Sequence, residues 1–246
     1  MKMYYNDVLA EVYIKRNQRN LAIEVLKEAR ALDLDTQSCE NIGTHLLRNL
    51  KRSKKLAQKY LDKGLVNQAE KTFTESLRIA HDIYGNENKH EDVAQIYLSL
   101  AFTAIKQKNF VKAKDYLDQT NELLSHINAH DKSGVWLFHK YSSDLLMAQE
   151  DYKGALQCLY ALIKIEKEWS DYAMDLGEFG AVYLRMGKCY LILGNIAAAE
   201  RNLLLSKKYF GKAVVQDGEN AIIDQERFEC TFYLAKCCIT SSGHVD

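Results

Sequence analysis

Histidine and carboxylate side chains could supply acid–base catalysis or metal ligands in this chain of 246 residues. His126 and His130 have the i, i+4 spacing that places two imidazole rings on one helix face, as in zinc-dependent hydrolases. A metalloprotease helix also needs a glutamate between its two histidines, and this pair has none. The stretch 128–133 (NAHDKS) has the composition of a loop. We therefore expect solvated histidines there and no metal site.

Cysteine and glycine patterns also fail to indicate a reactive centre. The six cysteines are scattered, and none forms the C-x-x-C pair of zinc or dithiol sites. Reduced cysteines that pack in the core are expected, although the adjacent Cys237 and Cys238 could also carry a lipid or a metal. Gly177 and Gly180 lack the third glycine and the preceding strand of a phosphate-binding loop. The sequence predicts no catalytic residue, no metal ligand and no cofactor, and the protein is not expected to be an enzyme.

The composition limits the class of partner. Lysine plus arginine and aspartate plus glutamate both number 33, so the chain has no overall positive field that would favour nucleic acid. No apolar run approaches the roughly 20 residues that cross a bilayer, and the first residues lack the core of a signal peptide. We therefore expect a cytoplasmic protein, or part of a larger one, without nucleic-acid binding or membrane insertion. The oligomeric state does not follow from the composition.

The elements that would position any site are amphipathic helices that recur at a regular period. Residues 91–125 carry apolar side chains at i, i+3, i+4 and i+7 in two segments divided by Lys108 and Asn109, which predicts a helical hairpin. An alanine three residues after an aromatic or aliphatic residue recurs every 42 to 44 residues, at Ala69, Ala113, Ala155 and Ala199. Such a period is typical of stacked repeats that bury their apolar faces against each other.

Other small and large residues follow the same period. Small residues occur twelve positions before each repeat alanine or at the equivalent place, namely Ala10, Ala57, Ala101, Ser143, Gly187 and Ala235. Small side chains at both positions let neighbouring helices approach closely. The large residue four positions after the alanine is expected to fill the remaining space, and this set is Leu26, Phe73, Leu117, Leu159 and Leu203.

The turns inside the hairpins have a recognisable chemistry. Asn109, Asp151 and Asn195 stand just before the second helices, where their side chains can accept hydrogen bonds from free backbone N–H groups. In two copies the preceding residue is a glycine, Gly64 or Gly194, which suits a left-handed conformation at the end of the first helix. The spacing therefore predicts the same turn in successive hairpins.

In these positions the chain resembles the tetratricopeptide repeat (TPR) family over nearly its whole length. Tyr97 and Tyr183 match the aromatic residue near the start of a TPR unit, whereas the proline that usually closes the unit is absent. The resemblance implies an all-α fold, a right-handed α-solenoid of about five TPR-like helical hairpins plus a terminal helix. The predicted hairpins, within a single superhelical domain over 1–246, cover 3–33, 40–83, 91–127, 132–169 and 172–213, with the terminal helix at 218–240.

The length of the repeats indicates a subtype. The hairpins exceed the basic 34-residue TPR unit by about eight to ten residues. The stretch 75–85 (ESLRIAHDIYG), followed by 90–95 (HEDVAQ), is similar to a repeat junction of kinesin light chains. Kinesin light chain repeats have about this length, and the resemblance implies binding of a cargo peptide in their groove.

In the TPR family the first helix of each unit lines a concave groove. The resemblance places nine residues there: Lys54, Gln58, Phe102, Lys106, Lys140, Asp144, Leu184, Lys188 and Lys236. Lysines outnumber acids in this set and are expected to be solvent-exposed, so the groove should be basic and bind an acidic peptide with hydrophobic anchors. The asparagine clamp of chaperone-tail TPR proteins is absent.

The implied function is that of a non-enzymatic scaffold or adaptor that holds a partner peptide or helix in this groove. The alternative is a regulatory or targeting TPR segment of a larger enzyme or transcription regulator. The sequence identifies neither the partner nor the pathway.

Overall fold

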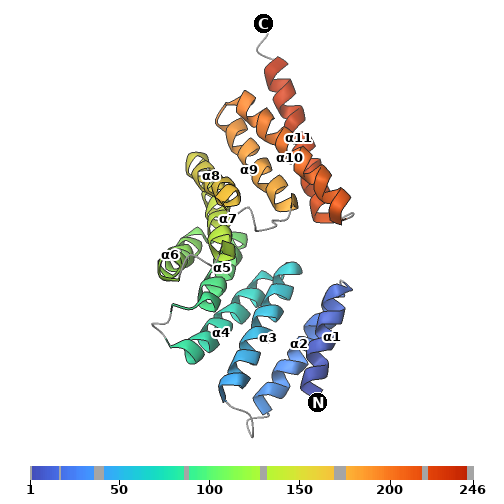
Figure 1. The fold of residues 1–246 in the computed structure, drawn as a ribbon, viewed down its shortest axis with the longest axis vertical. Coiled ribbons are helices and arrows are strands. Elements are labelled where there is room, and N and C mark those ends of the chain that lie inside the picture. Colours follow the sequence, from blue (N-terminus) through green and yellow to red (C-terminus); the bar gives the residue numbers. More distant parts are fainter. Residues whose placement is uncertain are drawn as a thin grey trace. The chain divides into compact units, whose positions relative to one another are not determined.

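The computed structural model describes residues 2–16, 18–35, 42–85, 89–127, 132–168, 176–217 and 221–242 (Figure 1). Within these ranges the regular structure consists of α-helices: α1 (Lys2–Lys15), α2 (Arg19–Asp35), α3 (Ile42–Asp62), α4 (Val66–Tyr84), α5 (Glu91–Lys106), α6 (Phe110–His126), α7 (Lys132–Ala148), α8 (Tyr152–Glu168), α9 (Leu176–Ile192), α10 (Ile196–Asp217) and α11 (Ala221–Ser242). The predicted fold class, helical hairpins followed by a terminal helix, is confirmed. Parts of the predicted hairpins, at 17, 40–41, 169 and 172–175, lie outside the described residues, as do residues 218–220 of the predicted terminal helix.

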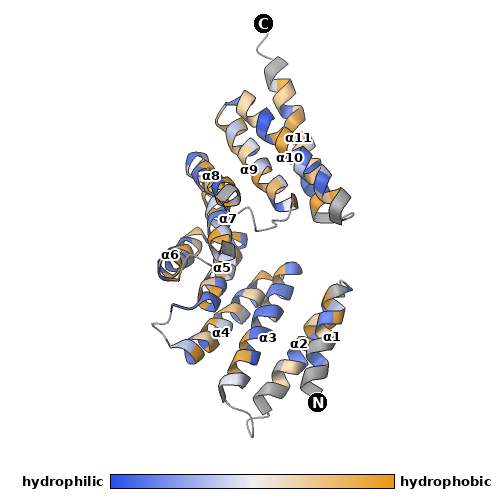
Figure 2. Cartoon of the chain, viewed as in Figure 1, coloured by the Kyte–Doolittle hydropathy of each residue, from blue (hydrophilic) through white to orange (hydrophobic). Residues whose placement is uncertain are grey.

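The contacts divide the chain into two compact units, unit 1 (Met1–Phe138) and unit 2 (His139–Asp246). Within unit 1 each helix from α1 to α6 packs against the next one in the chain, and within unit 2 the same holds from α8 to α11. A single continuous superhelical domain stays a prediction. Hydrophobic and hydrophilic residues are mixed along the helices (Figure 2), and α3 and α4 have a pronounced apolar side, as amphipathic helices do. None of the described helices combines the length and the apolar character that a membrane span requires.

The turns inside four hairpins share one backbone geometry. The φ angle is +74° at Gly64 and +79° at Gly194, as predicted, and Lys108 and Glu150 occupy the same left-handed region at +58° and +64°. In each turn the residue that follows the left-handed one donates its backbone N–H to the carbonyl oxygen of the residue five positions before it, at 2.9 Å. The repeated hydrogen bond shows that Lys108 and Glu150 adopt the same turn as the two glycines, although glycine adopts a left-handed conformation with less strain.

The predicted N-cap residues are confirmed. Asn109 Oδ1 accepts from the backbone N–H of Lys112 at 3.3 Å. Asp151 Oδ1 accepts from the backbone N–H three residues later at 2.9 Å, and Asn195 Oδ1 does the same at 3.1 Å. These bonds satisfy N–H groups that lack a partner in the first turn of a helix. The second helices therefore begin where the sequence predicted.

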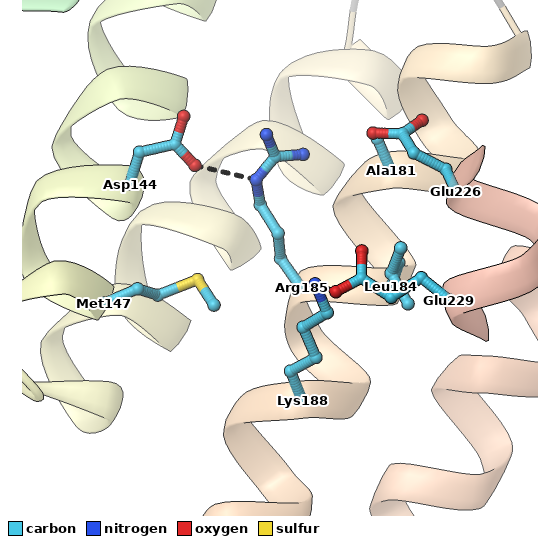
Figure 3. Close-up of a pocket in the computed structure, with 8 residues that line it drawn as sticks. All are labelled: Asp144, Met147, Ala181, Leu184, Arg185, Lys188, Glu226 and Glu229. Atoms are coloured by element: carbon cyan, nitrogen blue, oxygen red, sulfur yellow. Dashed lines mark hydrogen bonds and ion pairs between the residues drawn. The ribbon is translucent and has the colours of Figure 1, made fainter. Parts of the chain in front are cut away.

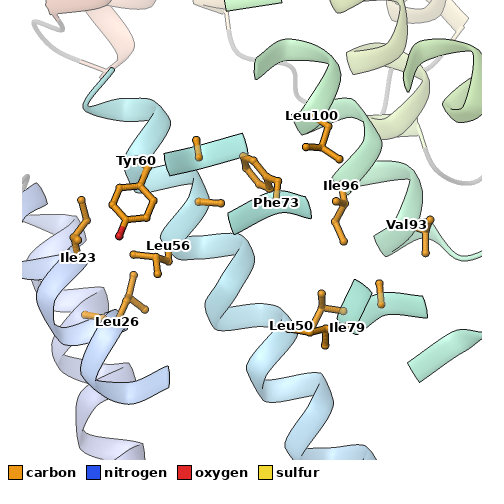
Figure 4. Close-up of a cluster of buried hydrophobic side chains, with 14 of the residues drawn as sticks. Ile23, Leu26, Leu50, Leu56, Tyr60, Phe73, Ile79, Val93, Ile96 and Leu100 are labelled. Atoms are coloured by element: carbon orange, nitrogen blue, oxygen red, sulfur yellow. The ribbon is translucent and has the colours of Figure 1, made fainter. Parts of the chain in front are cut away.

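The core of unit 1 is a continuous layer of apolar side chains (Figure 4). These side chains pack between the two helices of a hairpin and also between neighbouring hairpins. In both units the repeat alanines Ala69, Ala113, Ala155 and Ala199 are completely buried, as is Ala22 at the equivalent position of the first hairpin. The large residues that the sequence assigned to the neighbouring space are buried too: Leu26, Phe73, Leu117, Leu159 and Leu203. The predicted packing is confirmed.

Two glycines of α9 allow the close packing of unit 2. A Cβ atom on Gly187 would lie 2.6 Å from Cγ of Leu203, and one on Gly180 would lie 2.5 Å from the Phe210 ring. Both α10 side chains are completely buried. Ala235 holds the same repeat position as Gly187 but is exposed, because no second helix pairs with α11 in the described part of the chain. The repeat pattern therefore continues into α11, but in the described part of the chain no second helix packs over its small residue.

Candidate functional site

The first helices of successive hairpins contact each other through ion pairs. In unit 1, Lys54 on α3 donates from Nζ to Asp92 Oδ1 on α5 at 2.6 Å and to Gln95 Oε1 at 3.0 Å. Lys55 on α3 pairs with Glu11 on α1 at 2.8 Å. We call the surface of α1, α3 and α5 the first-helix face of unit 1, and the surface of α7, α9 and α11 the first-helix face of unit 2.

Unit 2 repeats this arrangement. Lys140 on α7 donates to both carboxylate oxygens of Glu178 on α9, at 2.8 and 2.6 Å. The pair Lys140–Glu178 is separated by 38 residues, as is the pair Lys54–Asp92. Lys188 on α9 pairs with Glu229 on α11. A lysine on one first helix therefore binds a carboxylate on the next first helix in both units.

These ion pairs correct the expectation of exposed lysines. The side chains of Lys54, Lys140 and Lys188 are only 25, 19 and 18 % exposed. The physical reason is that each lysine stem reaches across to the neighbouring first helix, where a carboxylate neutralises its charge. The three lysines therefore create no excess of positive charge on the first-helix faces.

Asp92 is held in its charged form by its neighbours. Burial acts to raise the pKa of this carboxyl group, but the hydrogen bonds from Lys54 and Tyr84 outweigh burial and lower the pKa below its ordinary value. The Tyr84 hydroxyl donates to Asp92 Oδ2 at 2.8 Å. The pair in unit 1 is therefore part of a satisfied polar network.

Two other predicted lysines lie over aromatic rings. Lys106 Nζ is 5.1 Å from the ring centroid of Phe102 on α5, and Lys236 Nζ is 4.9 Å from that of Phe232 on α11. These are cation–π contacts between residues i and i+4. Lys106 and Lys236 are exposed, and neither pairs with a carboxylate within the described ranges. Each unit thus presents an aromatic ring under a cation on its first-helix face.

The remaining predicted residues are Gln58, Asp144 and Leu184, and they differ in exposure. Gln58 is exposed and donates from Nε2 to Asp62 Oδ1 at 3.0 Å. Asp144 accepts from Arg185 Nε at 2.7 Å. Leu184, which was expected on the groove surface, is only 2 % exposed because it packs into the core of unit 2. The nine predicted residues are therefore distributed over both units, and the structure does not join them into one site.

A pocket of about 250 Å³ lies between α7, α9 and α11 of unit 2 (Figure 3). Eight residues line it: Asp144, Met147, Ala181, Leu184, Arg185, Lys188, Glu226 and Glu229. The sequence nominated Asp144, Leu184 and Lys188 but missed Arg185 and Glu226. The guanidinium of Arg185 lies between the carboxylates of Asp144 and Glu226 (Figure 3).

The pocket contains groups with perturbed acidity. Burial raises the pKa of the Glu226 carboxyl above its ordinary value, although the positive charge of Arg185 acts in the opposite direction. Burial would also lower the pKa of Arg185, but the carboxylates of Asp144, Glu226 and Glu178 raise it. Arg185 therefore stays charged, whereas charging Glu226 costs free energy in the folded protein.

Histidine and cysteine side chains are spread over several helices of the described part of the chain. It contains no cluster of three or more histidine, cysteine or carboxylate groups that could hold a metal ion. His126 ends α6, and His130 lies outside the described residues. Cys158, Cys189 and Cys230 form no disulfide, and Cys39 is outside the described residues.

Comparison with solved structures identifies the class of fold as TPR-like. BtubC from P. vanneervenii matches with a TM-score of 0.69 and 17 % identity over 87 % of this chain and 81 % of that chain. The kinesin-light-chain-type TPR-like repeats of Podosopora anserina match with a TM-score of 0.62 and 18 % identity over 85 and 95 % of the two chains. These likenesses show the fold, and they agree with the TPR resemblance of the sequence.

A third similar structure is a STAND signal-transduction ATPase with a TPR sensor from Pyrococcus horikoshii. Its TM-score is 0.64 and its identity 18 %, and the match covers 98 % of this chain but 32 % of that chain. No protein-family model matches the sequence, and no curated protein matches it. The solved structures therefore define the fold of this chain as TPR-like.

Proposed function

We propose that the protein is a non-enzymatic scaffold or adaptor that binds a segment of a partner protein on its first-helix faces. The observation that supports this proposal is the pair of ring–lysine contacts, Phe102–Lys106 in unit 1 and Phe232–Lys236 in unit 2. An aromatic ring beside a cation can pack against an apolar side chain while the ammonium group pairs with a neighbouring carboxylate. This combination suits a partner with hydrophobic anchors next to acidic residues.

Exposed apolar residues on α11 add to this argument. Phe228, Phe232 and Ile239 are 77, 50 and 73 % exposed. Their spacing places them on one side of the helix. Contiguous exposed apolar surface is uncommon on soluble proteins and marks interaction sites. The side of α11 that carries Lys236 is therefore suited to take a hydrophobic anchor.

The predicted site residues fall into two groups in this proposal. Gln58, Phe102, Lys106 and Lys236 lie at the surface and contact the partner directly. Lys54, Lys140, Asp144 and Lys188 hold neighbouring first helices together through their ion pairs, and Leu184 packs beneath them. The acidic character of the partner then depends on Lys106 and Lys236 rather than on the paired lysines.

The test is binding of a positional-scanning library of 12-residue peptides to the full chain. Phe102→Ala should weaken the preferred peptide by about tenfold, the loss expected for an aromatic anchor. Lys106→Glu should remove the preference for acidic residues. Matched controls on a second helix are Val111→Ala, at a residue that is 74 % exposed, and Lys114→Glu. A library without any preferred sequence, or equal losses in the controls, would contradict the proposal.

A second candidate function is a sensor or targeting segment within a larger regulatory protein. The match to the STAND ATPase favours it, because this chain corresponds to about a third of that protein (32 %). The measurement is the extent of the gene's reading frame. Continuation into an effector domain supports the sensor function, whereas flanking stop and start signals exclude it.

A further inference from the structure

Two of the ion pairs between first helices, Lys54–Asp92 and Lys140–Glu178, occupy equivalent places in the repeat. Lys54 and Lys140 each lie three residues before a small repeat residue, Ala57 or Ser143. Their partners Asp92 and Glu178 each lie nine residues before the small residue of the next first helix, Ala101 or Gly187. We call these places the lysine position and the acid position.

The junction between α9 and α11 keeps the acid but not the lysine. Glu226 lies nine residues before Ala235 and therefore occupies the acid position. The lysine position, three residues before Gly187, holds Leu184. Within the described ranges Glu226 makes no hydrogen bond or ion pair, whereas the neighbouring acidic residues do. One carboxylate of the repeated pattern is thus left without its cation.

The other cations at this junction already have partners. Arg185 donates to Asp144, Lys188 pairs with Glu229, and Lys140 is bound by Glu178. With these three pairs made, the pocket retains one excess negative charge, that of Glu226. A bound anion would face this carboxylate and its acidic neighbours, so electrostatics favours a cation.

The pocket has the size and lining for one side chain. Its volume of about 250 Å³ lies below the roughly 300 to 1,000 Å³ of sites for drug-sized ligands. Met147 and Leu184 form an apolar part of the lining, and Glu226 lies at another side of it (Figure 3). Lysine and arginine combine an apolar stem with a charged head, which matches this division.

We propose that this pocket accepts a lysine or arginine side chain of the bound partner, which supplies the cation missing from the lysine position. The stem contacts Met147 and Leu184, and the ammonium or guanidinium group pairs with Glu226. This inference rests on the proposed function, because the basic side chain belongs to the partner segment. It differs from the expectation of a purely acidic partner.

The test uses single-residue probes and the full chain with ¹³C-methyl-labelled methionine. N-acetyl-arginine methylamide and N-acetyl-lysine methylamide are titrated while the Met147 methyl resonance is followed. N-acetyl-norleucine methylamide has a similar stem without charge, and N-acetyl-glutamate methylamide has the opposite charge. At least one basic probe should shift the resonance saturably, roughly tenfold more tightly than either control probe.

Variants separate the role of Glu226 from a general charge effect. Glu226→Gln should weaken the basic probe by roughly tenfold, whereas Asp224→Asn, an exposed carboxylate on the same helix, should leave it unchanged. Leu184→Lys introduces the lysine found at the α3–α5 and α7–α9 junctions and should also block the probe. If Leu184→Lys fails to fold, Glu226→Gln still decides the question, because it preserves the shape of the side chain.

Two results would overturn the inference. The first is equal or tighter binding of the glutamate or norleucine probe, and the second is unchanged binding of the basic probes to Glu226→Gln. If the peptide library shows a preferred sequence but the basic probes do not shift Met147, the scaffold function stands and the pocket assignment fails. If the basic probes bind but no peptide does, the pocket assignment stands and the scaffold function fails.

Discussion

The acid position has opposite consequences at two junctions, the one between α3 and α5 in unit 1 and the one between α9 and α11 in unit 2. Asp92 in unit 1 receives hydrogen bonds from Lys54 and Tyr84, so its pKa is lowered. Glu226 in unit 2 makes no hydrogen bond or ion pair in the described part of the chain, Leu184 holds the lysine position, and burial raises the pKa of Glu226. The closed ion pair has a lysine at the lysine position, whereas the negatively charged pocket has a leucine there.

The largest expected effect comes from reversing a paired lysine. Lys140→Glu would place a carboxylate against both oxygens of Glu178 and should destabilise the protein by about 2 kcal/mol. This is below the value for fully buried pairs, because Glu178 is 37 % exposed. Thermal unfolding followed by circular dichroism measures the loss. Lys153→Glu on the exposed side of α8 should change stability by less than about 0.5 kcal/mol.

Equal melting temperatures of Lys140→Glu and the parent protein would show that the lysine is not held by Glu178. The expectation of an exposed, freely replaceable lysine would then be restored. Lys54→Glu in unit 1 offers the parallel test, since Asp92 is its partner.

The sequence was sufficient for the features that depend on local spacing. The repeat alanines, the N-caps at Asn109 and Asn195 and the left-handed glycines each depend on residues a few positions apart. The ion pairs could not be predicted in the same way, because Lys140 and Glu178 are 38 residues apart and the hairpin length varies. The resemblance to the TPR family placed Leu184 on the groove surface, because a repeat position defines only the side of the helix on which a residue lies. It does not predict which side chains of other helices pack over that residue and bury it.

A smaller effect is expected for the acid of the closed pair. Asp92→Asn should destabilise the protein by about 1 kcal/mol at pH 7, because it weakens the bonds to Lys54 and Tyr84. The folded pKa of Asp92 is lowered, so its contribution is present above the ordinary aspartate pKa and disappears as the pH falls through the folded value. Denaturant unfolding at pH 7 and in acid checks this, and a loss that is equal at both pH values would contradict it.

The smallest effect has the opposite sign. Glu226→Gln should stabilise the protein at pH 7 by about 0.5 kcal/mol, because it removes a half-buried charge that lacks a partner. The folded pKa of Glu226 is raised, so the favourable neutral form is present below the ordinary glutamate pKa and is lost as the pH rises through the folded value. The gain over the parent should therefore vanish in acid. A variant less stable than the parent at pH 7 would show that Glu226 has a cationic partner.

The most direct measurement of the contrast between the junctions is a carboxyl-carbon NMR titration of the full chain. Asp92 should titrate below the usual aspartate range and Glu226 above the usual glutamate range. Saturation with N-acetyl-arginine methylamide should lower the pKa of Glu226 and leave that of Asp92 unchanged. Ordinary pKa values for both groups, or a Glu226 pKa that the arginine probe does not move, would contradict the account of one closed and one open acid position.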